Sequence, residues 1–570
     1  MGGKETRLLL TTVFKPYGVE DGYAAGPGMQ MELFNNQITR GQRVHSPRAN
    51  FWTFPLYFLA ENVSVPCTVL DFPSWTDFIR ELKHGYTHVG LSFIQTNVMK
   101  VKRMAEYVRR HHPGTKIILG GYGTSLPDLA ALVPYDDVCH GEGIQWLRAY
   151  FGEDPARPVK HPIMHGVSQK HLYGVPGITD DSAVIFPGLG CENGCFFCST
   201  SSKFNHCYIP LLPTGRSVFD VCREAEARLG VREFAVIDEN FLKQPDRARD
   251  LLAEMERQGK SYNFWVFSSA EILTKMGVDF LVRLGVCAVW IGIETAHDVF
   301  GKMKDVDARG LIRELQDRGI SVISSSILFM EHHDRASLQA DIDWAIAFET
   351  DMHQFMQLTP LPGTPLFRQY LAEGRLIADF PYAKMSGQNV LNFHHPHFRP
   401  GEAYDITRQA FRKKYETHGP AVIKMAWTAL HGYSRARKDF EARMAQGLAW
   451  NPETLRYDRS AGRQSDDFMV LRLRMMRRRA EEFRPLLTAA WLFSPNTVAR
   501  RKCRELELCY REIFGPRGLV DVFKSSLLVL FGMVESLRLG WGRMRGRDEL
   551  IRQPPTRRIA YRNSGHAATP

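Results

Sequence analysis

Two series of short apolar segments, each alternating with helix-like segments, fill the first 400 residues of the chain. The first series covers residues 7–147 and contains "RLLLTTV", "CTVLDF", "HVGLSF", "KIILGG" and "DDVCHGEG". The second contains "SAVIFPGLG", "EFAVIDENF", "NFWVFSSA", "AVWIGIET", "SVISSSILF" and "HQFMQLTPLPGTP". Strands that alternate with helices form parallel α/β sheets. The sequence therefore predicts an open α/β sheet, followed by a barrel or part of a barrel with six strand–helix units.

The length and the change of pattern after residue 400 suggest several domains. A chain of 570 residues with 44% hydrophobic residues is folded and too long for one ordinary core. After residue 400 the strand signals fade, and Arg-rich helical patterns replace them. We expect a Rossmann-like domain over 1–150, a linker over 151–180, a partial (β/α)6 barrel over 181–400, a mostly helical region over 401–550 and a disordered tail over 551–570.

The composition of the chain limits where the protein is expected to be located and which partners it is expected to bind. No apolar run reaches the roughly 18 residues of a membrane span, so we expect neither a signal peptide nor a transmembrane helix. Seven of the ten cysteines are scattered without the spacing of a disulfide framework, which indicates a reducing compartment. The expected location is the cytoplasm, with peripheral contact at the inner face of the membrane left open. The net charge is +11, and much of the excess of Lys and Arg lies late in the chain. No nucleic-acid-binding module is recognisable, so we do not expect nucleic acid as a partner.

Three cysteines follow the first strand of the second series with the spacing Cys-x3-Cys-x2-Cys. They are Cys191, Cys195 and Cys198. Three thiolates can hold three irons of a four-iron cluster and leave the fourth iron an open position. A zinc site completed by His206 or Cys207 is the alternative, although structural zinc sites usually use paired Cys-x2-Cys units.

This loop resembles that of the radical S-adenosylmethionine (SAM) superfamily, including the aromatic Phe197 before the third cysteine. The resemblance implies that the three cysteines bind a [4Fe-4S] cluster and that the open iron binds the amino and carboxylate groups of SAM. An electron from the cluster then cleaves SAM to a 5′-deoxyadenosyl radical. It also implies a reductant such as flavodoxin or ferredoxin and a small-molecule or lipid substrate.

Polar side chains end three later strands of the second series, where a barrel places its chemistry. The resemblance implies that Asp238 or Glu239 meets the SAM amino group. It further implies that Ser268, Ser269 and Glu294 contact the SAM carboxylate or ribose. A solvated turn or a helix cap is the alternative reading of the acidic pair. The segment "TPLPGTPLF" at residues 359–367 resembles a turn of the cobalamin-binding subset, although its Pro and Gly also suit an ordinary turn.

The first series carries a second resemblance at its strand ends. Ser92 in "LSFIQ" and Gly120 with Gly121 in "ILGGYGT" resemble part of a cobalamin-binding signature, as does "HGEG" at residues 140–143. Open α/β sheets bind ligands at these ends, although glycines there can merely tighten a turn. The Asp-x-His-x-x-Gly motif that supplies a histidine to cobalt is missing, since His45 lacks both flanking residues. We expect bound cobalamin without that ligand.

Two further groups of residues resemble functional sites: a candidate membrane-binding helix and a set of histidines. The segment "GLVDVFKSSLLVLFGMVESLRLGWGRMRGR" can form an amphipathic helix whose basic end, Arg538 to Arg547, lies on an anionic membrane, or a packed helix with a solvated charged face. His332, His333, His394, His395 and His397 resemble metal ligands, but they lack carboxylate or Cys partners at fixed spacing. We expect them in loops near the entrance of the site.

Together these features predict a cobalamin-dependent radical SAM methyltransferase that acts on an unactivated carbon, in a lipid or isoprenoid by preference. The alternative within enzymes is a radical carbon–carbon coupling, cyclisation or lyase reaction without methyl transfer. A non-catalytic iron–sulfur protein that senses or binds SAM is the alternative from another class.

Overall fold

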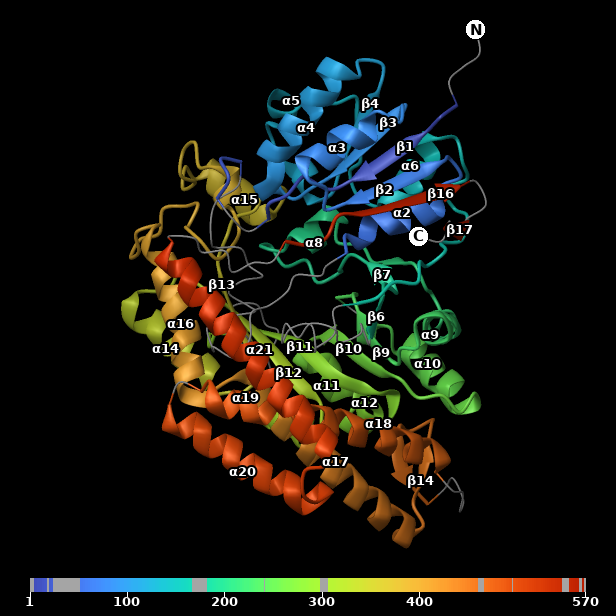
Figure 1. Ribbon diagram of the computed structural model, residues 1–570, viewed down its shortest axis with the longest axis vertical. Coiled ribbons are helices and arrows are strands. Elements are labelled where there is room, and N and C mark those ends of the chain that lie inside the picture. Colours follow the sequence, from blue (N-terminus) through green and yellow to red (C-terminus); the bar gives the residue numbers. More distant parts are fainter. Residues whose placement is uncertain are drawn as a thin grey trace.

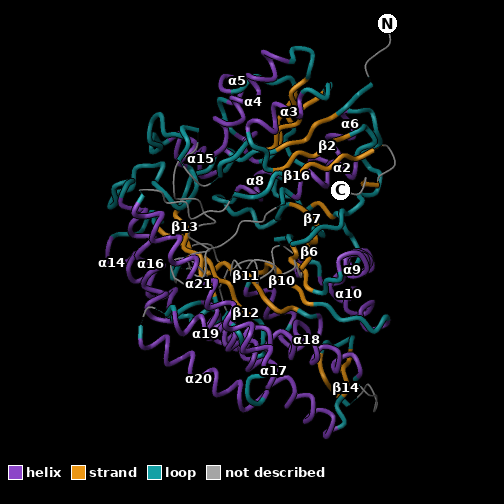
Figure 2. The backbone as a smooth tube through the Cα atoms, viewed as in Figure 1, coloured by secondary structure: helices purple, strands orange, loops and turns teal. Residues whose placement is uncertain are grey.

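The computed structural model describes residues 5–17, 20–23, 52–166, 182–239, 241–297, 306–459, 466–494, 496–545, 553–562 and 566–567. Figure 1 shows an N-terminal sheet at one end, a second sheet in the middle and the C-terminal helices at the other end. Figure 2 shows the same division, with strands in two groups and a cluster of helices beyond the second group. The predicted α/β class with a helical C-terminal region is confirmed.

The N-terminal sheet has the strand order β17-β16-β2-β1-β3-β4-β5. Its parallel strands are β1 (Leu8–Thr11), β2 (Cys67–Asp71), β3 (His88–Ser92), β4 (Lys116–Gly120) and β5 (Asp137–Val138). The helices between them are α2 (Phe54–Asn62), α3 (Trp75–Leu82), α4 (Val98–His111), α5 (Leu129–Leu132) and α6 (Gly143–Tyr150). Both faces of the sheet are covered, so the central residues of β1 to β4 are apolar without alternation.

The C-terminal segment, predicted to be a disordered tail, contains two strands of the N-terminal sheet. β16 (Arg557–Arg562) pairs antiparallel with β2, with Ile559 opposite Val69, and β17 (His566–Ala567) pairs with β16. Tyr561 is buried in the N-terminal core, and the Arg558 guanidinium donates to Glu81 of α3 at 2.7 and 2.9 Å. The prediction of disorder is therefore wrong for residues 557–562, because the segment covers the otherwise open edge of β2.

The second sheet contains six parallel strands in the order β13-β12-β11-β10-β9-β6. They are β6 (Ser182–Ile185), β9 (Glu233–Val236), β10 (Asn263–Ser268), β11 (Val286–Glu294), β12 (Ser321–Leu328) and β13 (Met352–Gln357). The intervening helices are α9 (Gly215–Leu229), α10 (Pro245–Arg257), α11 (Ala270–Met276), α12 (Val278–Leu284), α13 (Ala308–Asp317) and α14 (Arg335–Ile346), and α15 (Pro365–Ala372) follows β13. Each strand pairs with its sequence neighbour, which confirms the predicted open six-unit barrel.

The C-terminal helices cover the amino-terminal half of one face of this sheet. They are α16 (Glu402–His418), α17 (Ala421–Gln446), α18 (Asp467–Phe483), α19 (Leu486–Leu492), α20 (Thr497–Phe514) and α21 (Leu519–Met544), with a small hairpin of β14 (Ala449–Asn451) and β15 (Arg456–Asp458) after α17. Ile323 and Met352 of the sheet pack into their core, beside Trp265 and Trp290. Within the described part of the chain, every helix is too short or too polar to cross a bilayer.

Candidate functional site

The cysteine loop lies between the short strand β7 (Gly188–Leu189) and the helix α8 (Ser199–Lys203). Cys191 is buried, and Cys195 and Cys198 are half-buried. Burial raises the pKa of the Cys198 thiol, and the nearby Cys195 and Cys191 raise it further, whereas backbone N–H groups of α8 donate to its sulfur and lower it. The three thiols are thus close enough to influence one another, and they fit the donor set of an iron–sulfur cluster.

Close backbone contacts fix the shape of this loop. Gly190 has φ +81°, and a Cβ there would lie 2.2 Å from the carbonyl oxygen of Cys207. The Ser201 hydroxyl donates to the carbonyl of Cys191 at 2.8 Å and lies 2.9 Å from Nδ1 of His206. Cys207 is exposed. These contacts give His206 a role within the loop, which weakens the zinc alternative.

A cavity of about 600 Å³ separates the N-terminal sheet from the barrel at the carboxyl ends of both sheets. Its walls come from three parts of the chain. The N-terminal domain contributes Tyr17, Gln95, Asn97 and Tyr122, the cysteine loop contributes Phe197, Ser199 and Thr200, and the barrel contributes Glu294, Ser325, Gln354 and Met356. The fold therefore brings the end of the N-terminal sheet, the cysteine loop and the barrel strands around one space.

Phe197 and Glu294 are the two predicted site residues that line this cavity. Glu294 ends β11 with φ +55°, just after an irregularity in the pairing of β11 with β12. A strained conformation at a bulge redirects a side chain, and such strain is typical of functional sites. The Glu294 carboxylate lies over Gly292, where a Cβ would come within 2.4 Å of Oε1.

The two acidic residues after β9 have different surroundings. Asp238 is buried, pairs with Arg247 of α10 at 2.9 Å and accepts a hydrogen bond from the Tyr208 hydroxyl at 2.7 Å. Glu239 is exposed, and its pKa is raised, first by desolvation within the loop and then by the neighbouring Asp238. Asp238 therefore has buried partners on the protein, whereas Glu239 is exposed and has a hydrogen bond with the Thr200 side chain.

Ser268 and Ser269 lie at the end of β10, as expected, and both are half-buried. Ser269 stands at the N-cap position of α11, but its side chain makes no capping hydrogen bond. Neither residue is among those that line the cavity. Their predicted contact with SAM remains a prediction.

The strand ends of the N-terminal sheet lie together as the sequence predicts. Ser92 and Gly120 are register partners in β3 and β4. The α-carbon of Gly120 faces open space, so the sheet end can accept a ligand there. Gly121 has φ +89°, and a Cβ on it would lie 2.4 Å from the Phe93 carbonyl oxygen, so the tight-turn alternative holds for this glycine. His45 lies outside the described residues.

Three hydrogen bonds join this sheet end to α8, the helix after the cysteine loop. The Lys203 ammonium donates to the carbonyl oxygen of Gly121 at 3.0 Å and to the Thr124 hydroxyl at 2.6 Å. The hydroxyls of Tyr122 and Thr200 lie 3.2 Å apart. Figure 1 shows α8 between the two sheets. The helix that follows Cys198 therefore contacts the loop that follows β4.

Comparison with known proteins identifies the central part of the chain. Residues 185–345 match the family model described as the radical SAM superfamily, and this span includes the cysteine loop and strands β9 to β12. The chain contains a radical SAM domain.

Two curated relatives and one solved structure extend the comparison. The chain is 25% identical over 205 residues to an uncharacterized methyltransferase of Pyrococcus horikoshii, which covers 34% of this chain and 43% of that protein. It is 22% identical over 349 residues to the hopanoid C-2 methylase of Rhodopseudomonas palustris, covering 56% and 62%. The chain thus spans about half the length of these relatives. The fold is similar to that of the radical SAM methyltransferase TsrM from Kitasatospora setae with cobalamin and [4Fe-4S] cluster bound, at TM-score 0.51 and 16% identity over 77% of this chain and 100% of that one.

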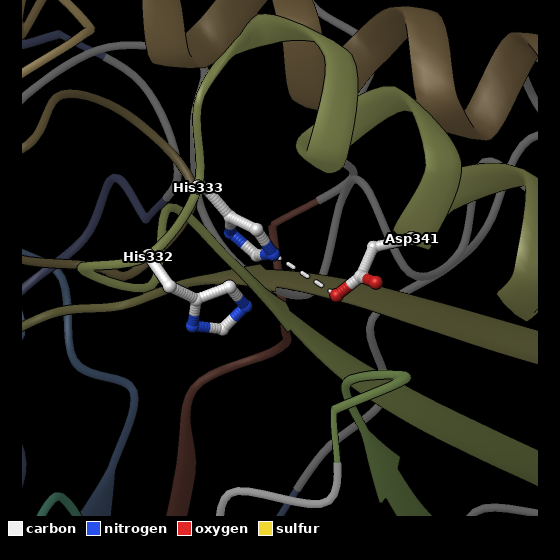
Figure 3. Close-up of side chains that lie close together, drawn as sticks. All are labelled: His332, His333 and Asp341. Atoms are coloured by element: carbon white, nitrogen blue, oxygen red, sulfur yellow. Dashed lines mark hydrogen bonds and ion pairs between the residues drawn. The ribbon is translucent and has the colours of Figure 1, made fainter.

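A histidine group lies at the end of β12 in the radical SAM domain. The ligand atoms of His332, His333 and Asp341 all lie within 4.8 Å of one another. Figure 3 shows the His333 ring directed at the Asp341 carboxylate. The Met330 N–H donates to His333 Nδ1, so the proton sits on Nε2 and is donated to Asp341 at 2.9 Å, with Thr295 donating to the same oxygen at 2.6 Å. This tautomer leaves no lone pair on Nε2 for a metal, which favours a structural role.

Several cavity residues were missed from the sequence. Ser325 and Gln354 line the cavity from β12 and β13, and the polar residues within these two strands are a usable signal. Gln95 and Tyr122 follow β3 and β4 directly, so their position after strand ends also pointed to a site. Asn389 belongs to a loop whose place depends on how the radical SAM domain meets the N-terminal domain, and no local pattern marks it.

Gly120 and Gly121, at the end of β4, offer a matched pair of variants. We expect Gly121→Ala to destabilise the protein by about 1–3 kcal/mol, because Ala must adopt a positive φ and meets the Phe93 carbonyl. Gly120→Ala should change stability by about 0.5 kcal/mol or less, because its Cβ enters open space. Chemical denaturation of both variants measures the difference. Equal effects would contradict the assigned backbone roles.

Proposed function

We propose that the chain is a cobalamin-dependent radical SAM methyltransferase that acts on an unactivated carbon of a neutral, largely apolar molecule. The observation that carries this proposal is the cavity shared by the cysteine loop and the strand ends of the N-terminal sheet. A methyl donor held over β3 and β4 and a radical generated at the cysteine loop would both reach a substrate in this space. The whole reaction is proposed for this chain, since its relatives match over only part of their length.

The donor sets suit the proposed cofactors. Cys191, Cys195 and Cys198 would hold the cluster and leave one iron open for SAM. When bound, the cluster supplies the electron that cleaves SAM, and cobalamin supplies the methyl group. The exposed Glu239 carboxylate is better placed than Asp238 to accept the SAM amino group, because Asp238 already pairs with Arg247. Glu294 and Phe197 form the wall of the cavity nearest to the barrel strands and the cysteine loop.

The lining of the cavity indicates the substrate class. Among the described residues that line it, Glu294 is the one charged side chain, and the others are apolar, amide or hydroxyl groups. Apolar walls with a few polar groups suit a neutral ligand, whereas the described lining offers a phosphate or carboxylate no cationic partner. A lipid or isoprenoid fits this lining, in keeping with the hopanoid in the name of one relative. We further propose a cytoplasmic location and a reductant such as flavodoxin or ferredoxin.

The test uses anaerobically reconstituted protein supplied with cobalamin, SAM and a reductant. A neutral lipid extract from a host that lacks the gene serves as substrate. We expect 5′-deoxyadenosine and S-adenosylhomocysteine to form together, with a lipid that gains one methyl group. Formation of 5′-deoxyadenosine without S-adenosylhomocysteine would favour coupling, cyclisation or lyase chemistry, and formation of neither would favour a SAM-binding sensor.

Cobalamin should bind without a histidine on cobalt, because the Asp-x-His-x-x-Gly motif is missing from the sequence. Electron paramagnetic resonance of the bound cob(II)alamin should therefore show no superhyperfine splitting from an axial nitrogen. Nitrogen splitting would contradict this expectation. Its loss in His140→Ala would then identify the exposed histidine after β5 as the ligand, and its loss in His45→Ala would identify His45 instead.

A further inference from the structure

The helix α21 exposes far more apolar surface than any other described element. Among the described residues, eleven of the seventeen exposed large apolar side chains belong to this one helix. In Figure 1, α21 is a single long helix that crosses in front of the second sheet. Contiguous apolar patches of this kind mark interaction surfaces on folded proteins.

The exposed side chains form a continuous stripe. Leu519, Phe523, Leu527, Leu530, Val534, Leu537 and Trp541 follow one another at intervals of three or four residues, which places them on one face of the helix. Phe523 is 69% exposed and Leu537 is 75% exposed. At about 1.5 Å per residue, the 26 residues of α21 make the helix about 39 Å long.

The opposite face anchors α21 to the protein. Ser525 and Leu528 are buried, and the Ser525 hydroxyl donates to the Pro485 carbonyl at 3.2 Å beside α19. The Arg517 guanidinium donates to Ser525 at 2.9 Å and to Glu507 of α20. These contacts fix which face points outward. The packed-helix alternative, in which the apolar residues are buried, is therefore wrong for the stripe.

We propose that α21 docks on an anionic lipid bilayer, with its apolar stripe inserted at the boundary between headgroups and acyl chains. The positive charge of this region favours an anionic membrane as the partner, because residues 498–545 contain ten Lys and Arg against five Asp and Glu. Lys524 and Arg545 are exposed at the two ends of the stripe, and the Arg545 guanidinium lies 3.8 Å from the ring centroid of Trp541. Trp beside a basic side chain is typical of a helix that lies in a membrane interface.

A short stretch of chain joins the C-terminal end of α21 to the cavity. Seven residues lie between Arg545 and Gln553, whose side-chain amide exchanges two hydrogen bonds with the backbone of Tyr17 at 2.7 and 2.9 Å. Tyr17 lines the cavity. The eight steps from residue 545 to residue 553 span at most about 29 Å in an extended chain. Entry of a membrane-dissolved substrate by this route rests on the proposed function, whereas the membrane contact itself does not.

Sedimentation of the full-length protein with vesicles tests the docking surface. We expect binding to vesicles of phosphatidylcholine mixed with phosphatidylglycerol, weaker binding to phosphatidylcholine alone, and loss of binding as salt rises. The triple variant Phe523→Ser, Leu530→Ser and Leu537→Ser should bind the mixed vesicles about tenfold less or weaker still. These side chains are exposed, so its circular dichroism and iron content should match the unmodified protein.

A matched control removes three exposed apolar side chains elsewhere. The variant Met99→Ser, Leu371→Ser and Met444→Ser should bind vesicles like the unmodified protein. Failure of the unmodified protein to bind either kind of vesicle would overturn the proposal. Concentration-dependent dimerisation that is lost in the α21 variant, without vesicle binding, would assign the stripe to a second copy of the chain and overturn it as well.

Discussion

Protein in which Cys191, Cys195 and Cys198 are all replaced by Ala is expected to hold no four-iron cluster and to form no 5′-deoxyadenosine from SAM. The physical reason is that thiolates are the cluster ligands, and these three are the cysteines that the loop after β7 brings together. Iron and sulfide content, visible absorption and product analysis under strong reduction measure the effect. Full iron content with SAM cleavage in the triple variant would remove the basis of the assignment.

Cys207→Ala is the control from the segment that follows α8. Cys207 is exposed, and its thiol donates only to the nearby Asn205 carbonyl at 3.4 Å among the hydrogen bonds of the described residues. The variant should keep its cluster and its SAM cleavage. If it instead lost bound zinc and the unmodified protein showed no iron–sulfur absorption, the zinc alternative would be correct.

The strands and their order were predictable from the sequence, because each depends on local patterns. Apolar runs such as "AVWIGIET" are strands of a parallel sheet covered on both sides, and short connections make sequence neighbours pair. β16 was not predictable in this way. Its partner β2 lies nearly 500 residues earlier, and its basic composition hides the inward Ile559 and Tyr561.

The same distinction between local patterns and tertiary contacts applies to the candidate site. The cluster ligands lie within eight residues of one another, so the sequence alone reveals them. Ser92 and Gly120 were predictable because parallel strands end at one edge. The cavity itself depends on how two domains meet, which is why Asn389 carried no clear local signal.

The two acidic residues after β9 show a different limit of sequence-based prediction. Asp238 and Glu239 both follow the end of β9, and the sequence does not indicate which of the two carboxylates contacts a ligand. The separation comes from Arg247, which reaches Asp238 from α10 with its side chain almost fully buried. A tertiary ion pair therefore buries one of the two adjacent carboxylates and leaves the other exposed.

Arg247→Met is expected to destabilise the radical SAM domain by about 3–5 kcal/mol, since it leaves the Asp238 carboxylate buried without its ion-pair partner. It also removes the hydrogen bond from the guanidinium to the Tyr208 hydroxyl at 2.6 Å. Chemical denaturation of the reconstituted protein measures the loss. A change below about 1 kcal/mol would mean that Asp238 is hydrated or otherwise compensated.

The double variant Arg247→Met with Asp238→Asn separates a structural role of Asp238 from a ligand role. Removing the carboxylate removes the unpaired charge, so the double variant should regain a large part of the stability lost in Arg247→Met. SAM binding should return with it, because the exposed Glu239 remains. Glu239→Gln should instead keep its stability and bind SAM more weakly, by about tenfold for one lost charged hydrogen bond. Recovery of stability in the double variant without recovery of SAM binding, together with normal binding in Glu239→Gln, would assign the SAM contact to Asp238.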